Sequence, residues 1–240
     1  MQLVPVLEIR HGKCVHTLPK KNSTEQIVKE NLLEVVERLV DSGITRFHIV
    51  DVDAIASGEP ENVDLIEKIK IRYPTIQLQL IGGINSVDAA FVWIDAGVDY
   101  LVLNSKSVKR KNLLDDICLS FPNKVLVELD CCQFKQQGDA ILELLQRLDE
   151  DGVAGIVMTD IGATTQIVKQ NIISICDLIR HVELPIFING GIENTQDVAF
   201  YLSPEVARVD GILISKVLYS NAFSLTDANE VIKTHQLSTD

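Results

Sequence analysis

Two carboxylates occupy equivalent places in the chain, each at the end of a short apolar run. Glu8 follows Leu3–Leu7, and Asp130 follows Val125–Leu129. Two carboxyl groups that share a pocket can divide acid–base work when their surroundings separate their pKa values, because one then donates a proton while the other removes one. Either group could instead cap a helix or pair with a lysine. The two positions are candidates for general acid–base catalysis.

Two Gly-Gly pairs provide a second chemical signal. Gly82-Gly83 and Gly190-Gly191 each follow an apolar run and precede residues that favour a helix start. A glycine pair at a strand-to-helix turn lets backbone N–H groups approach an anion, and the helix N-terminus adds about half a positive charge. One such pair alone would more readily indicate a tight turn. Its repetition favours two phosphate-binding sites.

Further candidate ligands stand at the ends of the other apolar runs. They are Asn104, Ser105, Asp160, Asn189, Ser215 and Lys216. Lys216 is the only formally cationic residue among these run ends, so it is a candidate phosphate ligand, although a solvated lysine would have the same sequence. The carboxylates lack nearby histidines at metal-ligand spacing, so the sequence predicts no metal site.

Eight short apolar runs carry these residues. They are Leu3–Leu7, Phe47–Val52, Ile76–Ile81, Tyr100–Leu103, Val125–Leu129, Gly155–Thr159, Pro185–Ile188 and Gly211–Ile214. Amphipathic stretches such as Glu25–Val40 and Ala140–Leu148 separate them, and this alternation predicts βα units with a parallel sheet. Eight units whose ends are all polar or glycine favour an α/β fold of the (β/α)8 TIM-barrel class, which gathers those ends on one face. An open sheet of the Rossmann type is the alternative.

The chain also repeats itself. Residues 39–51 align without gaps on residues 148–160, and the Gly-Gly pairs match at a similar offset of about 110. The repeat predicts a single domain over residues 1–240, a barrel with twofold internal duplication whose half-barrels are about 1–122 and 123–240. Glu8 and Asp130 would then face each other across the mouth, and the ligand should have two similar ends.

Composition excludes several classes of function. The 240 residues are 46% apolar and 23% charged, which is typical of globular proteins. A net charge of −12 disfavours binding to nucleic acid. No apolar run reaches the roughly 18 residues of a membrane span, and the N-terminus lacks the signal-peptide pattern. The 5 cysteines are odd in number and lack C-x-x-C spacing, so we expect reduced thiols and a cytoplasmic protein.

Several segments together resemble the ProFAR isomerase family of histidine biosynthesis and, more distantly, the cyclase subunit of imidazole-glycerol-phosphate synthase. They are Val4–Glu8, Gly12–Val15, His48–Asp53, Gly58–Asn62, Gly82–Ile84, Asp95–Gly97, Leu129–Asp130, Thr159–Ile161, Asn189–Ile192 and Leu218–Tyr219. The resemblance implies an Amadori rearrangement of an aminoaldose phosphate to an aminoketose phosphate, without metal or organic cofactor. The expected partner is a small sugar phosphate with a phosphate at each end, and we expect a monomer.

By position, the resemblance makes Glu8 the base and Asp130 the acid. The family has Asp at the first position, and the extra methylene of Glu8 displaces the carboxylate by about 1 Å. The family's Arg-Asp-Gly turn is replaced within residues 162–166, where Thr164 is a candidate substrate contact. Ser215-Lys216 replaces Gly-Arg, and lysine lacks arginine's bidentate fork. These departures leave two alternatives: a divergent paralogue that acts on another sugar phosphate, and a non-catalytic phosphate-binding barrel.

Overall fold

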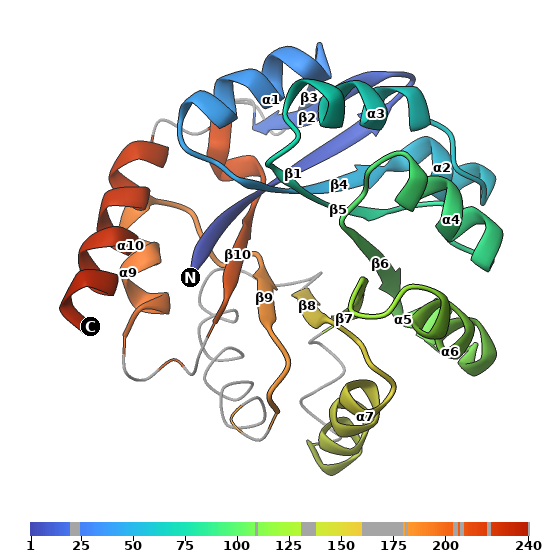
Figure 1. Ribbon diagram of the computed structural model, residues 1–240. Coiled ribbons are helices and arrows are strands. Elements are labelled where there is room, and N and C mark those ends of the chain that lie inside the picture. Colours follow the sequence, from blue (N-terminus) through green and yellow to red (C-terminus); the bar gives the residue numbers. More distant parts are fainter. Residues whose placement is uncertain are drawn as a thin grey trace. The chain divides into compact units, whose positions relative to one another are not determined.

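Figure 1 shows a computed structural model of the 240-residue chain. The structure describes residues 1–19, 25–108, 110–130, 138–159, 180, 182–203, 206, 209–219 and 222–239. Its parallel strands and intervening helices follow the order of a (β/α)8 barrel, which confirms the predicted fold class over an open Rossmann-type sheet. The chain forms two compact units, Val4–Ser120 and Met1–Leu3 with Phe121–Asp240.

The unit Val4–Ser120 is built on four parallel strands. In sheet order they are β1 (Gln2–Arg10), β4 (Arg46–Asp51), β5 (Gln77–Ile81) and β6 (Tyr100–Asn104). Its helices are α1 (Leu32–Asp41), α2 (Val52–Ser57), α3 (Val63–Arg72), α4 (Val87–Asp95), α5 (Ser105–Val108) and α6 (Lys111–Ser120). Buried Leu, Ile and Val side chains of the strands, α1 and α3 form its core, together with Ala89, Ala90 and Trp93 of α4. The helices thus hold the carboxyl ends of the strands in place.

An antiparallel hairpin extends β1 and corrects one expectation. The strands β2 (Lys13–Pro19) and β3 (Glu25–Glu30) pair with each other, and β2 pairs with β1 across a turn at His11 and Gly12. Both turn residues have positive φ, 51° and 69°, as a two-residue hairpin turn requires. The predicted helix Glu25–Val40 is therefore wrong in its first part, because the backbone ladder with β2 takes residues 25–30. The helix begins only after Asn31, whose side chain accepts a hydrogen bond from Leu33 N.

The second unit is also built on four parallel strands, of which β9 and β10 have only 4 residues each. Its parallel strands, in sheet order, are β7 (Val125–Asp130), β8 (Gly155–Thr159), β9 (Ile186–Asn189) and β10 (Gly211–Ile214). The helical elements described are α7 (Gly138–Glu150), α9 (Thr195–Tyr201), the 3-10 turn η2 (Lys216–Tyr219) and α10 (Leu225–Thr239). Helices α9 and α10 pack side by side (Figure 1). The start of β1 belongs to this unit, because Gln2 N donates to Asp210 O at 2.9 Å.

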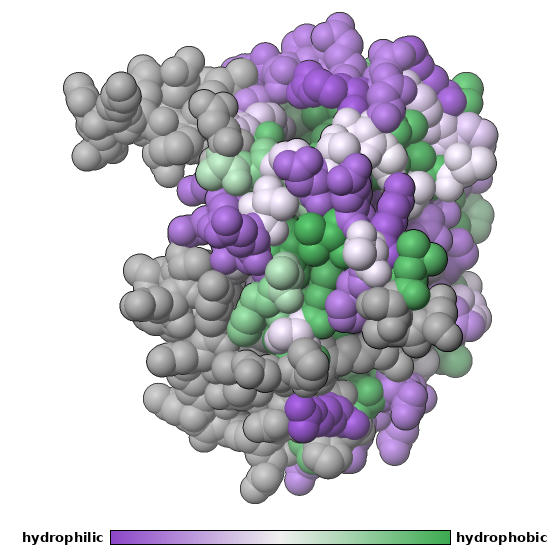
Figure 2. Space-filling view, turned by 90° about the vertical axis from the view of Figure 1, so that its left-hand side faces the viewer, coloured by the Kyte–Doolittle hydropathy of each residue, from purple (hydrophilic) through white to green (hydrophobic). Residues whose placement is uncertain are grey.

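The described surface is mixed in character. Figure 2 shows hydrophilic residues around a smaller apolar area on one face. Among the described helices, none has the length and apolar character that crossing a membrane requires.

A polar cluster lies inside the first unit. The register of the strands places His48, Gln79 and Tyr100 side by side. Arg46 Nε donates to Gln79 Oε1 at 2.8 Å, and Gln79 Nε2 lies 2.9 Å from His48 Nδ1. Because the Gln79 oxygen is already an acceptor for Arg46, its amide N–H must face His48, so Nδ1 is the acceptor and the imidazole carries its proton on Nε2. The guanidinium of Arg46 stacks over the Tyr100 ring at 4.4 Å.

Burial of His48 makes the stability of the protein depend on pH. Desolvation, with a contribution from the positive charge of Arg46, lowers the pKa of His48 to about 3. The unfolded chain binds a proton at this side chain below about pH 6.5 while the folded chain does not, so stability is lost as the pH falls through that range. We expect His48 to lower the free energy of unfolding by about 1.4 kcal/mol for each pH unit below about 6.

Denaturant unfolding at pH 7, 6 and 5 tests this expectation. The variant His48→Gln keeps an acceptor for Gln79 but does not titrate, so its stability should fall less steeply with acid than that of the wild type. Parallel pH profiles of the two proteins would contradict the assignment of a neutral His48.

Candidate active site

Glu8 lies at the carboxyl end of β1 with an exposed side chain. Leu7 and Ile9 on the opposite strand face are buried, 1% and 0% exposed. In the parallel register Glu8 is level with Val50 of β4, which is level with Ile81 of β5. Glu8 is therefore an exposed carboxylate in an otherwise apolar row.

The neighbouring carboxylates Asp51 and Asp53 have structural partners. Asp51 is fully buried and accepts hydrogen bonds from Ala54 N, Asn62 N and Asn62 Nδ2 at 2.9–3.1 Å. Asp53 accepts from Asn62 Nδ2 at 3.1 Å and from His11 N at 2.6 Å. Desolvation by itself would raise the pKa of Asp53, but the hydrogen bonds from Asn62 and His11 lower it below its ordinary value. The two carboxylates thus join the hairpin turn to the start of α2. Within the described residues, no group of three or more His, Cys, Asp or Glu side chains is arranged to hold a metal ion.

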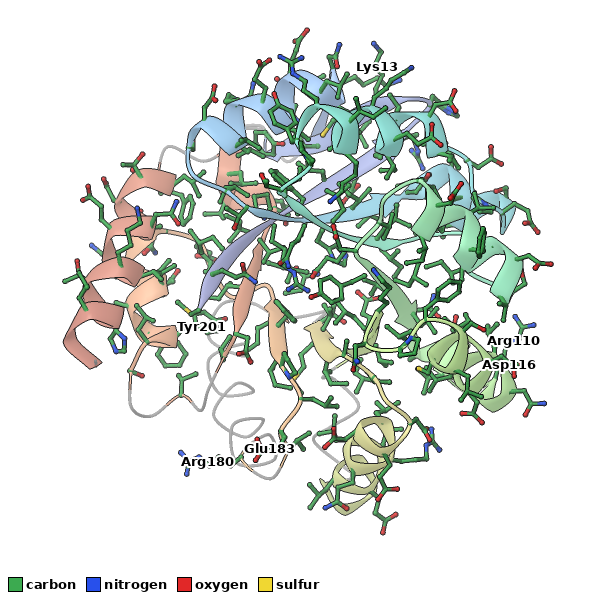
Figure 3. All side chains as sticks on the ribbon, in the orientation of Figure 1. Lys13, Arg110, Asp116, Arg180, Glu183 and Tyr201 are labelled. Atoms are coloured by element: carbon green, nitrogen blue, oxygen red, sulfur yellow. The ribbon has the colours of Figure 1, made fainter. Side chains whose placement is uncertain are left out.

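The two Gly-Gly turns share local geometry. All four glycines have positive φ, from 65° to 142°. Trp93 Nε1 on α4 donates to Gly82 O at 2.9 Å, and Tyr201 Oη on α9, labelled in Figure 3, donates to Gly190 O at 3.1 Å. The helix that follows each turn is capped by a side chain four residues after the first glycine, Ser86 in one case and Asn194 in the other. The local design of the turn is therefore the same in both units.

The space around the two turns differs. A Cβ atom on Gly82 would lie 2.7 Å from Asp51 O, and one on Gly83 would lie 2.5 Å from the carbonyl carbon of Glu59. By contrast, no described atom would come within 4 Å of a Cβ on Gly190. Close backbone approach accounts for glycine at 82 and 83, as the tight-turn interpretation expects. Anion binding at either turn stays a prediction.

In the second unit, a row of polar side chains crosses the carboxyl ends of three strands. The parallel register aligns Asp130 of β7 with Thr159 of β8, and Thr159 with Asn189 of β9. Asp130 and Asn189 are half-buried, while Thr159 is buried and its Oγ1 donates to Leu129 O at 3.3 Å. The structure thus brings two of the predicted site residues into one row, joined by a threonine that the sequence analysis did not select as a ligand.

Glu128 is the second residue that the sequence analysis missed. It lies on the same face of β7 as Asp130, one row further toward the strand start, and is half-buried. Its row continues with Val157 and Phe187, which are both buried. Desolvation, and then the negative charge of Asp130, raise the pKa of Glu128. The available signal was a glutamate two residues before Asp130 inside an otherwise apolar run.

The other predicted residues have varied surroundings. The Asn104 Oδ1 atom accepts hydrogen bonds from Ser107 N at 3.1 Å and Ser107 Oγ at 3.4 Å, so it caps α5, which begins at Ser105. Ser215 follows β10 and is half-buried, and Lys216 begins η2 with an exposed side chain. Asp160 and Thr164 lie outside the described residues.

Comparison with known proteins gives one family. The model of the family described as "Histidine biosynthesis protein" matches residues 2–224. A relative from Thioalkalivibrio sulfidiphilus is 30% identical over 239 residues, which are 96% of this chain and 99% of the relative. A relative from Crocosphaera subtropica is 31% identical to this chain, over 95% of this chain and 91% of the relative. A relative from Pseudomonas putida is 26% identical, over 98% of this chain and 100% of the relative. All three carry the name 1-(5-phosphoribosyl)-5-((5-phosphoribosylamino)methylideneamino) imidazole-4-carboxamide isomerase.

The difference between the two glycine turns predicts unequal costs of substitution. In Gly82→Ala the new methyl group meets a backbone oxygen at a positive φ, so we expect a loss of about 3 kcal/mol or more in the free energy of unfolding. In Gly190→Ala only the positive φ is unfavourable, and we expect a loss of about 1 kcal/mol. Denaturant unfolding of the two variants measures both values. Equal losses would show that the space around the two turns is the same.

Proposed function

Because the chain belongs to the histidine biosynthesis protein family and is similar to its ProFAR isomerases over nearly its whole length, we propose that it is a cofactor-independent isomerase. Its reaction is the Amadori rearrangement of an aminoaldose phosphate to an aminoketose phosphate. The observation that supports this proposal most directly is the position of Glu8 and Asp130. Each stands at the carboxyl end of its strand, opposite a face of buried apolar side chains. In (β/α)8 barrels, active sites are built at that end of the strands.

Asp130 is the proposed general acid and Glu8 the proposed general base. Asp130 protonates the ring oxygen of the aminoaldose, the bond from that oxygen to C1 breaks, and the nitrogen lone pair forms a protonated Schiff base. Glu8 then removes the proton from C2, and the resulting enaminol tautomerises to the aminoketose. One proton is given and one is taken, so the isomerisation is balanced. Each positioned group contributes on the order of 10²–10⁴-fold to the rate.

We also propose that the two glycine turns hold the phosphate ends of the substrate. Backbone N–H groups of such turns suit an anion, because they donate hydrogen bonds and need no side chain between them and the ligand. The open space beside Gly190 supports this role in the second unit, where Lys216 and Asn189 are further candidate ligands. In the first unit, Asn104 at the end of β6 and Ser105 after it complete the proposed set. Asp160 and Thr164 remain proposed substrate contacts.

The acid and base roles predict large losses of activity without loss of the fold. We expect Asp130→Asn and Glu8→Gln each to lower kcat by about 10²–10⁴-fold, because the amide can neither donate nor remove the proton. The melting temperature should change by no more than a few degrees. Turnover of the aminoaldose phosphate and thermal unfolding followed by circular dichroism give the two measurements.

Complementation of a histidine auxotroph supplies an independent readout. The wild type should restore growth, while Asp130→Asn should not. Full activity of Asp130→Asn would remove Asp130 as the acid. A wild type that binds the substrate but neither turns it over nor restores growth would identify a phosphate-binding barrel, and turnover of a different aminoaldose phosphate would identify a divergent paralogue.

A further inference from the structure

We infer that Trp93 and Tyr201 are positioning residues for the two proposed phosphate sites. Each holds the peptide between a pair of glycines in the orientation that turns the N–H group of the second glycine toward the phosphate. The inference rests on the proposed function, because it concerns how the Gly-Gly turns bind an anion. Neither residue lies in the segments that carry the family resemblance.

The two aromatic residues occupy equivalent positions. Trp93 stands 11 residues after Gly82, and Tyr201 stands 11 residues after Gly190. Each lies on the helix that follows its turn, α4 or α9, and is 0% or 4% exposed. Each donates a hydrogen bond to the carbonyl oxygen of the first glycine, at 2.9 Å and 3.1 Å. Because an indole and a phenol differ in shape, the property that the two positions share is a hydrogen-bond donor.

A peptide between two glycines needs such a donor to fix its orientation. Neither glycine has a Cβ atom, so side-chain contacts do not restrict the rotation of the peptide plane. That rotation exchanges the directions of the C=O and N–H groups, as between turns of types I and II. Both turns nevertheless have one geometry, since the first glycine of each pair has a φ of 142° or 111° and the second a φ of 65° or 75°. The hydrogen bond from the helix selects this orientation.

The selected orientation turns an N–H group away from the helix. The described peptide bonds are all trans, so the carbonyl of the first glycine and the N–H of the second point in opposite directions. Since the carbonyl oxygen faces the aromatic donor, the N–H groups of Gly83 and Gly191 point away from α4 and α9. Within the described residues, no backbone carbonyl accepts a hydrogen bond from either group. An anion on that side of the turn can accept it.

The reversed peptide would oppose binding in two ways. It would turn the carbonyl oxygen of the first glycine toward the phosphate, so that two negatively charged oxygens meet. It would also remove an N–H donor from the phosphate, and a hydrogen bond to an ionised acceptor is about twice as strong as one between neutral groups. A side chain that prevents the reversal therefore strengthens binding without contacting the ligand.

The two turns should depend on their aromatic donors to different extents. Beside Gly190, no described atom would come within 4 Å of an added Cβ, so Tyr201 has little help from neighbouring atoms in holding the turn. Beside Gly82, the backbone oxygen of Asp51 would lie 2.7 Å from an added Cβ. This close packing restricts the first turn in addition to Trp93. We therefore expect the larger effect in the second unit.

Titration with inorganic phosphate tests the inference without requiring turnover. The backbone amides of Gly83 and Gly191 are followed by 1H–15N NMR in the full-length protein, and in the wild type both signals should shift and saturate. In Tyr201→Phe, which removes only the hydroxyl group, we expect binding at Gly191 to weaken by about tenfold, from the loss of one charge-assisted hydrogen bond. The response of Gly83 should not change in this variant.

The first unit offers a matched pair of variants. Trp93→Tyr and Trp93→Phe lose a similar volume, but only the first keeps a donor, which is of the type that reaches the carbonyl in the second unit. The phosphate response of Gly83 should be retained in Trp93→Tyr and weakened in Trp93→Phe. As a control, Tyr73→Phe removes the same hydroxyl group at the end of α3, before the start of β5, and should change neither response.

Steady-state kinetics separates positioning from a purely structural role. In the active protein, Tyr201→Phe should raise KM by about tenfold with little change in kcat, because the phosphate end is held equally in the ground state and the transition state. A structural role would lower the melting temperature and leave KM unchanged.

The outcomes also separate this inference from the proposed function. Wild-type phosphate binding and KM in a folded Tyr201→Phe would overturn the inference and leave the phosphate sites in place, and the aromatic groups would then only satisfy their own polar atoms. Wild-type amides that do not respond to phosphate would overturn both the inference and the phosphate sites. The expected responses in a wild type that does not turn over the aminoaldose phosphate would support the inference while removing the proposed reaction.

Discussion

The alternation of side chains along each strand is the constraint on which the candidate site depends. In β7 it buries Val127 and Leu129 under one face and leaves Glu128 and Asp130 on the other. A slip of one residue would exchange the two sets and place both acids in the apolar layer. In other strand pairs of both units, equivalent contacts oppose a slip of this kind. Asp99 accepts a hydrogen bond from Leu78 N at 2.8 Å, and Asp210 accepts one from Ile186 N at 2.9 Å, each at the start of a neighbouring strand.

The two units combine the same backbone devices with different interiors. Both have an aromatic side chain that donates to the first carbonyl of a Gly-Gly turn. In the first unit, Gln79 lies within hydrogen-bond distance of both Arg46 and His48. In the second unit, Glu128 is level with the apolar Val157. A buried polar group is stabilised by its partners, whereas a carboxyl group in an apolar row is stabilised by keeping its proton. The two units thus share the backbone of the Gly-Gly turns but differ in the polarity of the side chains below the strand ends.

The features that follow from short stretches of sequence were predictable. The strand runs, the fold class and the tight turns at the glycine pairs each depend on neighbouring residues, and the structure confirms them. The start of the helix predicted from Glu25 was not predictable, because the apolar spacing of Glu25–Val40 fits a helix while the pairing with β2 depends on a distant ladder. The environment of Glu128 was hidden for a similar reason, since it depends on Val157 and Phe187, which are far away in the sequence.

The protonation of Glu128 explains why a second acid on β7 is compatible with an anionic substrate. The chain carries a net charge of −12, so each further ionised group near the strand ends would weaken the binding of a sugar phosphate. Desolvation raises the pKa of Glu128, and a carboxyl group that keeps its proton adds no negative charge to the face of β7. Burial beside Val157 therefore limits the electrostatic cost of this glutamate to the binding of an anion.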